Sequence, residues 1–156
     1  MRQAAGLADT VRRLEAYCRD REWAGFDPYD ALNSPLVERT PLGGSRLVRL
    51  ALTQLLKRSP VNLRPLLRIA PHQNPKALGL FLSFYAGRAA AGEPGARESA
   101  GVVARRLLEL RSPGTPQWCW GYSFPWQMRT KLVPRYAPNL VCTSFAASGL
   151  LDAYEA

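Results

Sequence analysis

Three segments of the chain carry apolar residues at helical spacing on one face and arginines on the other. They span residues 4–21, 45–58 and 96–111. In the first, Leu7 and Val11 begin an apolar series with intervals of three or four residues. A helix with this pattern buries one face and exposes the other. The pattern therefore predicts three amphipathic helices on the outside of the fold.

Three other segments have helix start signals and little polar surface. They begin at Ser34, Asn74 and Asn139, and a proline directly follows the first two. Serine and asparagine side chains cap free N–H groups, and proline is tolerated in the first turn. The first of these elements is short, at 34–39. The other two are apolar nearly all round, which predicts that they are buried on several sides.

Outer and inner helices alternate along the chain. This order predicts an all-α fold of three consecutive helical hairpins that lie side by side. No segment with the period of two that is typical of β-strands competes with it. We expect residues 1–156 to form a single domain, because this length suits one compact unit.

The connections between these helices are unequal. Links from an outer to an inner helix are long, at residues 23–33, 59–73 and 112–137, whereas the return links are short and rich in glycine and proline. In a row of hairpins all links of one kind lie at the same end, and long loops on a rigid scaffold tend to carry function. The inner-helix N-termini point there too and favour anionic or hydroxyl-rich ligands. Residues collected at this end include Trp23, Asp27, Tyr29, Asp30, Asn33, Asn62, Arg64, His72, Lys76, Arg129, Arg135 and Asn139.

One of these loops is unusually aromatic, since three of the chain's four tryptophans lie within nine residues. Flat rings with polar groups beside them suit a sugar ring, a base or another flat ligand. We predict a binding cleft in which Trp120, Tyr122 and Trp126 stack on the ligand, while Gln127 and Arg129 bind its polar groups. The alternative is a satellite core beneath the loop, which is the commoner fate of any single ring.

Charge and cysteine content narrow the function classes. The 156 residues carry a formal net charge of +9, with a pI of about 10.1. The arginines are spread over every segment, which favours solvated helix faces over a nucleic-acid stripe. The three cysteines lack a CxxC pair, which indicates neither a disulfide framework nor a zinc site and favours a reducing compartment. With no signal peptide and no membrane-length apolar run, the expected location is cytoplasmic, with no membrane partner.

Five segments resemble an uncharacterised bacterial family: residues 25–35, 53–65, 74–76, 119–122 and 138–145. Members of that family are found near polysaccharide-biosynthesis genes and are similar to the six-hairpin α/α-toroid superfamily of glycosidases and related carbohydrate enzymes. The resemblance covers most of the chain. It implies an incomplete α/α toroid and a role in carbohydrate metabolism.

The chain departs from that family pattern at two points. Pro125 stands between Phe124 and Trp126, where the pattern favours an aspartate, so a carboxylate is lost here if that aspartate is catalytic. Three hairpins also make only half of a six-hairpin ring and leave apolar inner helices exposed at two open edges. The half ring predicts self-association, pairing with a second chain, or a truncated reading frame.

Catalytic carboxylates are scarce in the predicted site. Glycoside cleavage commonly uses two, and Asp27 and Asp30 are the acidic pair in a site loop. Turn capping around Pro28 is the favoured role of Asp30, whereas Asp27 is equally suited to capping and to catalysis. His72 is the only histidine, so the chain lacks the material for a metal cluster or a Ser/His/Asp triad. It is kept as a binding candidate beside Lys76. No cofactor is expected, and the absence of a glycine-rich phosphate loop argues against an ordinary nucleotide enzyme.

Three functions follow from these features. The leading one is binding or processing of a glycan, preferably an acidic one, whether or not a reaction is catalysed. Its remaining polar candidates are Tyr29, Asn33, Asn62, Arg64 and Asn139. The second is a non-catalytic interaction module that pairs through the open edges. The third, and least favoured, is an RNA or single-stranded nucleic-acid binder that uses the same rings as base platforms.

Overall fold

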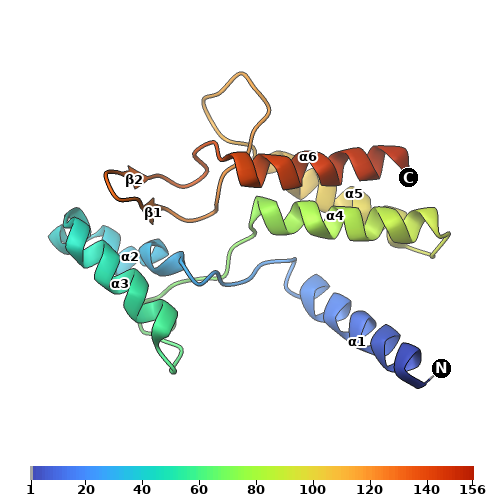
Figure 1. The fold of residues 1–156 in the computed structure, drawn as a ribbon, viewed down its shortest axis with the longest axis horizontal. Helices are drawn as coiled ribbons and strands as arrows, with labels where there is room; N and C mark the ends of the chain where they lie inside the picture. Colours follow the sequence, from blue (N-terminus) through green and yellow to red (C-terminus); the bar gives the residue numbers. More distant parts are fainter. Residues whose placement is uncertain (1) are drawn as a thin grey trace.

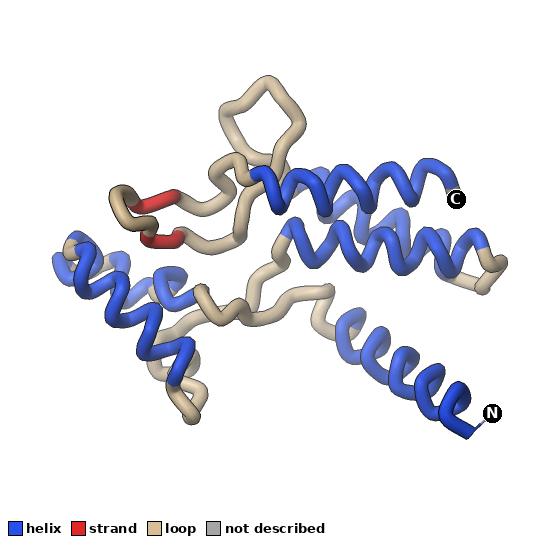
Figure 2. Tube along the Cα trace, viewed as in Figure 1, coloured by secondary structure: helices blue, strands red, loops and turns tan. Residues whose placement is uncertain are grey.

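The computed structural model describes residues 2–156 and is mostly helical (Figures 1 and 2). Its α-helices are α1 (Arg2–Arg19), α2 (Pro35–Glu38), α3 (Arg46–Arg58), α4 (Pro75–Ala90), α5 (Ala96–Glu109) and α6 (Leu140–Glu155). Short 3₁₀ turns at Asp30–Asn33 and Pro41–Gly44 flank α2, and β1 (Trp126–Gln127) pairs antiparallel with β2 (Leu132–Val133). The helical prediction is confirmed, while the small β-hairpin inside the aromatic loop was not expected.

Side-chain caps begin the three inner helices; the sequence predicted those at Ser34 and Asn74, and the structure adds one at Asn139. The Asn74 side chain accepts the N–H of Lys76 at 3.1 Å, and the Asn139 side chain accepts that of Cys142 at 3.1 Å. Ser34 caps α2 in the same way. Each such cap stabilises a helix by about 1 kcal/mol. The caps therefore fix where α2, α4 and α6 begin.

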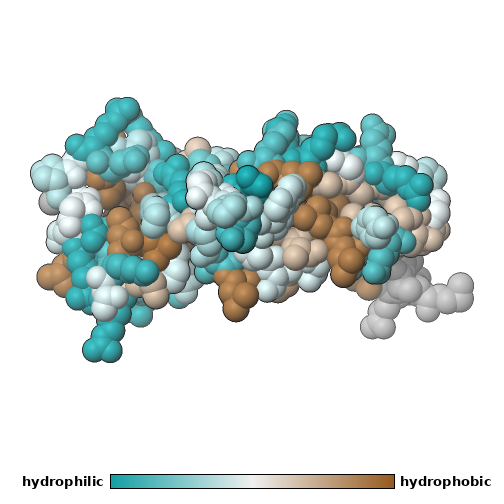
Figure 3. Space-filling model, turned by 90° about the horizontal axis from the view of Figure 1, so that it is seen from above, coloured by the Kyte–Doolittle hydropathy of each residue, from teal (hydrophilic) through white to brown (hydrophobic). Residues whose placement is uncertain are grey.

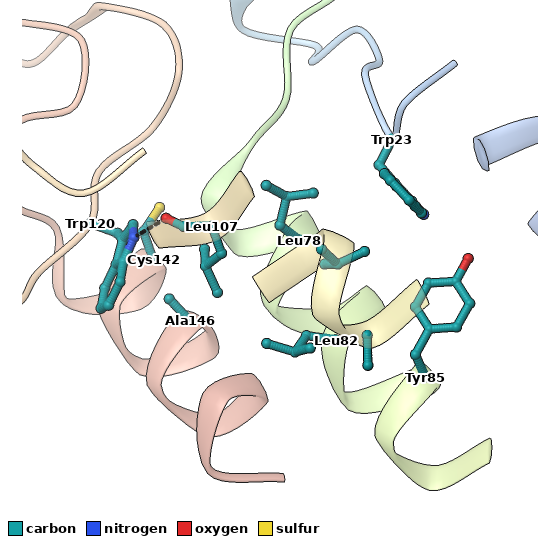
Figure 4. Packing of buried hydrophobic residues seen from close by; sticks show 10 residues of the cluster. Trp23, Leu78, Leu82, Tyr85, Leu107, Trp120, Cys142 and Ala146 are labelled. Atoms are coloured by element: carbon teal, nitrogen blue, oxygen red, sulfur yellow. Dashed lines mark hydrogen bonds between the residues drawn. The ribbon is translucent and has the colours of Figure 1, made fainter. Parts of the chain in front are cut away.

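Helices α4, α5 and α6 form the main bundle. Helices α4 and α6 run parallel to each other, and α5 packs behind them (Figure 1). Two glycines bring the α4 and α6 backbones into contact, because a Cβ on Gly79 would overlap the Phe145 carbonyl and one on Gly149 would overlap that of Gly79. Leu82 and Trp120 lie in the core that the three helices enclose (Figure 4).

Helix α3 does not lie beside α4, so the row of three hairpins is not seen. It packs instead on the two 3₁₀ turns that flank α2 and on β1. Its apolar side, at Leu52 and Leu56, is covered by Leu63 and Ile69 from the segment that follows α3. Because this connecting segment supplies its own apolar residues, one side of α3 is covered without a neighbouring inner helix.

The apolar faces of α1 and α6 are more exposed than the sequence predicted. Helix α1 diverges from the bundle, and Leu7 on its apolar side is 67% exposed (Figure 1). Helix α6 buries the face with Cys142 and Ala146 but leaves Leu140 82% exposed and Tyr154 89% exposed. Apolar patches are visible over the α4–α6 half of the molecule (Figure 3). The prediction that α6 is buried on several sides was wrong, because α4 and α5 cover one side of it only.

No helix in residues 2–156 is both long and apolar enough to cross a membrane.

Candidate functional site

Two of the long loops meet at the N-terminal ends of α4 and α6. They enclose a cleft of about 490 Å³, which we call the aromatic cleft. The cleft is lined by Asp27, Pro28, Tyr29, Asn74, Lys76, Tyr122, Phe124, Trp126 and Asn139. The structure therefore brings the Asp27 loop and part of the aromatic loop to one place, together with the capped starts of two helices.

Close backbone contact holds the aromatic loop in this position. The N–H of Asn139 donates to the Trp120 carbonyl at 2.9 Å, and the N–H of Tyr136 donates to the Tyr122 carbonyl at 2.8 Å. Between them, a Cβ on Gly121 would overlap the Ala137 carbonyl oxygen. Only glycine allows two backbones to approach this closely. Tyr122 is thus fixed directly in front of the first turn of α6.

Aromatic rings form the walls of the aromatic cleft. Tyr122 stacks on Phe124 with ring centroids 5.2 Å apart and an angle of 22° between the ring planes. Tyr29 lies on the opposing loop, where its hydroxyl accepts a hydrogen bond from Lys57 Nζ at 2.6 Å. Trp126 stands on β1 and is partly buried. Such walls suit a flat ligand that presents both ring faces and polar edges.

Asp27 and Lys76 supply the charges of the aromatic cleft. The Asp27 carboxylate accepts the N–H of Tyr29 at 2.9 Å, and burial raises the pKa of Asp27 above its ordinary value of 3.8. Lys76 lies with its ammonium 4.9 Å from the Phe145 ring centroid. Beneath them, burial raises the pKa of the Cys142 thiol to about 11, so this thiol is protonated and unreactive at neutral pH.

Other predicted stacking and binding residues of the aromatic loop lie outside this cleft. Trp120 is only 2% exposed and donates its indole N–H to the Leu107 carbonyl at 2.8 Å, within the core (Figure 4). Gln127 accepts from Arg49 at 2.7 Å and thereby ties the β-hairpin to α3. Arg129 is exposed in the turn between β1 and β2. Of the three rings predicted to stack on a ligand, the structure places Tyr122 and Trp126 at the cleft.

Asp30, Arg64 and Asn62 have structural contacts. Asp30 is buried and accepts from Arg64 Nε at 3.0 and 3.2 Å, and from the Asp27 N–H at 3.1 Å. Arg64 also donates to the Asp27 carbonyl at 2.8 Å. Asn62 accepts the N–H of Arg64 at 3.2 Å in a short turn. These contacts hold the Asp27 loop in place.

Asn33 and His72 line a second hollow, which shares Asp27 with the aromatic cleft. This inner cavity has a volume of about 270 Å³. His72 is held by a backbone bridge to Gly25, with hydrogen bonds of 2.9 and 3.1 Å. Burial, and then the charge of Arg135, lower the pKa of His72, so its imidazole is neutral at neutral pH. No group of three or more potential metal-binding side chains was found among the described residues.

Three residues of the aromatic cleft, Pro28, Asn74 and Phe124, were not predicted from the sequence to line a binding site. Phe124 lies between Tyr122 and Trp126 in sequence, and this spacing of two places all three on one side of an extended segment. Asn74 was identified only as a helix cap, although it also lines the cleft. The period of two in this loop was the signal that could have identified Phe124.

Replacing Asp27 with asparagine should stabilise the protein at pH 7 but not at pH 3.5. The raised pKa means that the ionised carboxylate is disfavoured in the folded state. The stability that Asp27 contributes is therefore complete below pH 3.8 and is lost as the pH rises through the folded-state pKa. Asparagine stays neutral and can still accept from Tyr29. Thermal unfolding at both pH values measures the effect, and exposed Asp9→Asn is the control. Equal melting temperatures at pH 7 for Asp27→Asn and wild type would contradict this expectation.

The shape and lining of the aromatic cleft indicate which ligands it can bind. Aromatic walls with one carboxylate and one ammonium group form a concave site for a flat, hydroxylated ligand. Neither the family models, nor the curated proteins, nor the solved structures contain a match to this chain.

Proposed function

We propose that this protein binds a glycan in the aromatic cleft. The observation that carries the proposal is the grouping of Tyr29, Tyr122 and Trp126 around Asp27 and Lys76. Aromatic rings pack against the apolar faces of sugar rings, and polar groups at their edges bind hydroxyls. The ammonium group of Lys76 favours a glycan that carries a carboxylate.

Binding is better supported than cleavage. Hydrolysis of a glycosidic bond commonly needs two carboxylates that flank the bond. Asp27 is the carboxylate that lines the aromatic cleft, while Asp30 is occupied by Arg64. Pro125 stands where the resembled family favours an aspartate. We therefore propose a carbohydrate-binding role in polysaccharide metabolism, with Asp27 as the candidate for any catalytic step.

We also propose that the C-terminal half represents one part of an α/α toroid. The parallel arrangement of α4 and α6, with α5 behind them, is that of two inner helices and an outer helix (Figure 1). Both inner helices begin at the aromatic cleft. Helices α1 and α3 do not extend this arrangement.

Trp126→Ala should weaken glycan binding by about tenfold. An aromatic contact contributes on the order of 1 kcal/mol beyond the area it buries, and 1.4 kcal/mol corresponds to a factor of ten. Isothermal titration with neutral and acidic oligosaccharides measures the loss. Trp118→Ala is the matched control, because Trp118 is 59% exposed and does not line the cleft. If no sugar binds, while single-stranded RNA binds with a steep salt dependence, the nucleic-acid function replaces this proposal.

The exposed side of α6 favours a second candidate, an interaction module. Leu140, Leu151 and Tyr154 are 82%, 57% and 89% exposed on this helix. Exposed apolar surface of this kind is typical of protein–protein contacts. We propose self-association or pairing with a second chain through α6. Sedimentation velocity over a range of concentrations tests the self-association, and a monomer at every concentration would contradict that form of the proposal.

A further inference from the structure

The formal charge of the chain is divided unevenly over the structure. Of the 21 basic and 12 acidic residues, ten basic residues and one acidic residue lie in residues 35–70 and 126–136, which leaves eleven of each elsewhere. These two segments form α2, α3, the segment after α3 and the β-hairpin, which lie together at one end of the molecule (Figure 1). We call this end the basic lobe. It carries the whole formal net charge of +9, although arginines occur in every part of the chain.

Most cations of the basic lobe are exposed and have no acidic partner. The exposed ones are Arg39, Arg46, Lys57, Arg58, Arg68, Arg129, Lys131 and Arg135. None of these eight forms a salt bridge with a described residue, whereas Arg12, Arg19 and Arg88 in the other part of the molecule are paired with carboxylates. A surface of one sign without internal neutralisation attracts ligands of the opposite sign.

The basic lobe adjoins the aromatic cleft. Lys57 donates to the hydroxyl of Tyr29, which lines the cleft, and its ammonium lies 4.5 Å from the centroid of that ring. Arg46 and Lys57 are eleven residues apart, or about three helical turns, so they lie on one side of α3. Arg49, between them, donates to Gln127 of β1 at 2.7 Å. This side of α3, which is about 20 Å long, therefore runs between the β-hairpin and the cleft.

A hollow of about 490 Å³ lies in the basic lobe between α2, α3 and the β-hairpin. Arg49 and Arg135 are the cations that line it, and Glu38 is its carboxylate. No aromatic residue is among the described residues of its lining, and residues 35–70 contain none. Proteins that bind single-stranded nucleic acid commonly stack bases on aromatic rings. The lining of the basic lobe therefore favours a charged sugar chain over RNA.

We infer that the protein binds an extended acidic polysaccharide, with one part of the chain in the aromatic cleft and the neighbouring sugar units over the basic lobe. The inference rests on the proposed glycan binding and extends it from a short ligand to a polymer. Guanidinium groups bind carboxylates through paired N–H donors. Each exposed charge contact contributes little, but a polymer with one carboxylate per sugar unit forms several of them at once.

The experiment compares oligogalacturonates of three and of twelve units, in which every unit carries a carboxylate. The trimer measures binding at the aromatic cleft, and the dodecamer also reaches along α3. Isothermal titration of the full chain should show that the dodecamer binds more tightly than the trimer. Its affinity should also fall more steeply with salt concentration, because more contacts between cations and carboxylates displace bound counterions.

The double variant Arg46→Gln with Arg58→Gln tests the basic lobe. Both arginines are exposed on α3 and do not line the aromatic cleft. The variant should bind the dodecamer about fivefold more weakly, as expected for two exposed charge contacts, and with a shallower salt dependence. Its affinity for the trimer should be unchanged.

The matched control is Arg13→Gln with Arg105→Gln. It removes the same charge from exposed positions on α1 and α5, outside the basic lobe. At 0.15 M salt, charges more than about 8 Å from the ligand are largely screened. The control should therefore bind both oligomers as the wild type does.

The outcomes separate the inference from the proposed function. If the Arg46 and Arg58 variant binds the dodecamer as tightly as the wild type, or if the control loses as much affinity, the inference is overturned while trimer binding upholds the proposed function. Tighter binding of a twelve-nucleotide polyuridylate than of the dodecamer at equal salt also overturns it, in favour of a nucleic acid. If neither oligomer and no other glycan binds, the proposed function fails and the inference with it.

Discussion

Arg64→Met should destabilise the protein by about 3–5 kcal/mol, because it leaves the carboxylate of Asp30 buried without its cation. The Asp30 side chain is 4% exposed and the Arg64 side chain 17%, and the two groups are 3.0 Å apart. Removal of one partner from a buried pair costs far more than the pair contributes, since the remaining charge keeps its desolvation penalty. Urea unfolding followed by circular dichroism measures the loss.

The double variant Asp30→Asn with Arg64→Met separates this cause from lost packing. It removes both charges and should recover most of the stability. The exposed pair of Asp9 and Arg12, with side chains 57% and 69% exposed, gives the control. Arg12→Met should change the free energy of unfolding by less than about 1 kcal/mol. If Arg64→Met costs no more than Arg12→Met, the buried pair does not have the role described here.

Arg64→Met should also affect the aromatic cleft. Arg64 donates to the carbonyl of Asp27 at 2.8 Å, and Asp30 accepts the N–H of Asp27. The ion pair thus holds the loop on which Asp27 and Tyr29 stand. Arg64 was predicted from the sequence as a ligand-binding residue, and the structure places its guanidinium on protein groups instead.

Helix positions were predictable because their signals are local. The side chain of Asn74 reaches an N–H only two residues away, and Pro75 acts within the same turn. Such contacts form whatever the rest of the chain does. The predicted segments 45–58 and 96–111 therefore agree closely with α3 and α5.

Packing partners were not predictable in the same way. The spacing of Leu52 and Leu56 indicates that one side of α3 is buried, but any apolar surface can cover it. Ile69, in a segment predicted only as a loop, does so. In α6, Leu140 and Leu151 fit the apolar pattern of a buried helix, yet α4 and α5 are too few to cover them.

The site was predictable in outline and not ring by ring. Loop lengths correctly indicated that Asp27, Tyr122 and Trp126 lie at one end. Trp120 precedes Tyr122 by two residues, so the period of two in this loop would place its ring at the cleft as well. Its backbone N–H, however, donates to the side-chain hydroxyl of Thr143 on α6 at 3.0 Å. This tertiary contact directs the Trp120 ring into the core. No pattern within the loop distinguishes it from its neighbours.

Gly79→Ala should destabilise the protein by about 2–3 kcal/mol, although alanine is the better helix former. A Cβ at this position would lie 2.7 Å from the carbonyl carbon of Phe145, which is backbone and cannot rotate away. Helices α4 and α6 would have to separate, and overpacking of this kind typically costs 1–3 kcal/mol. Separation would also move Lys76 and Asn139 apart at the aromatic cleft. Thermal and urea unfolding measure the loss of stability.

Gly87→Ala is the control, because it makes the same chemical change in the same helix. Gly87 is exposed and has no atom within 4 Å of an added Cβ. Alanine at an open helical site stabilises by up to about 1 kcal/mol through its higher helix propensity. The two substitutions should therefore have opposite signs. If Gly79→Ala also stabilises the protein, α4 and α6 do not pack backbone to backbone, and the spacing of the groups that line the aromatic cleft would have to be reconsidered.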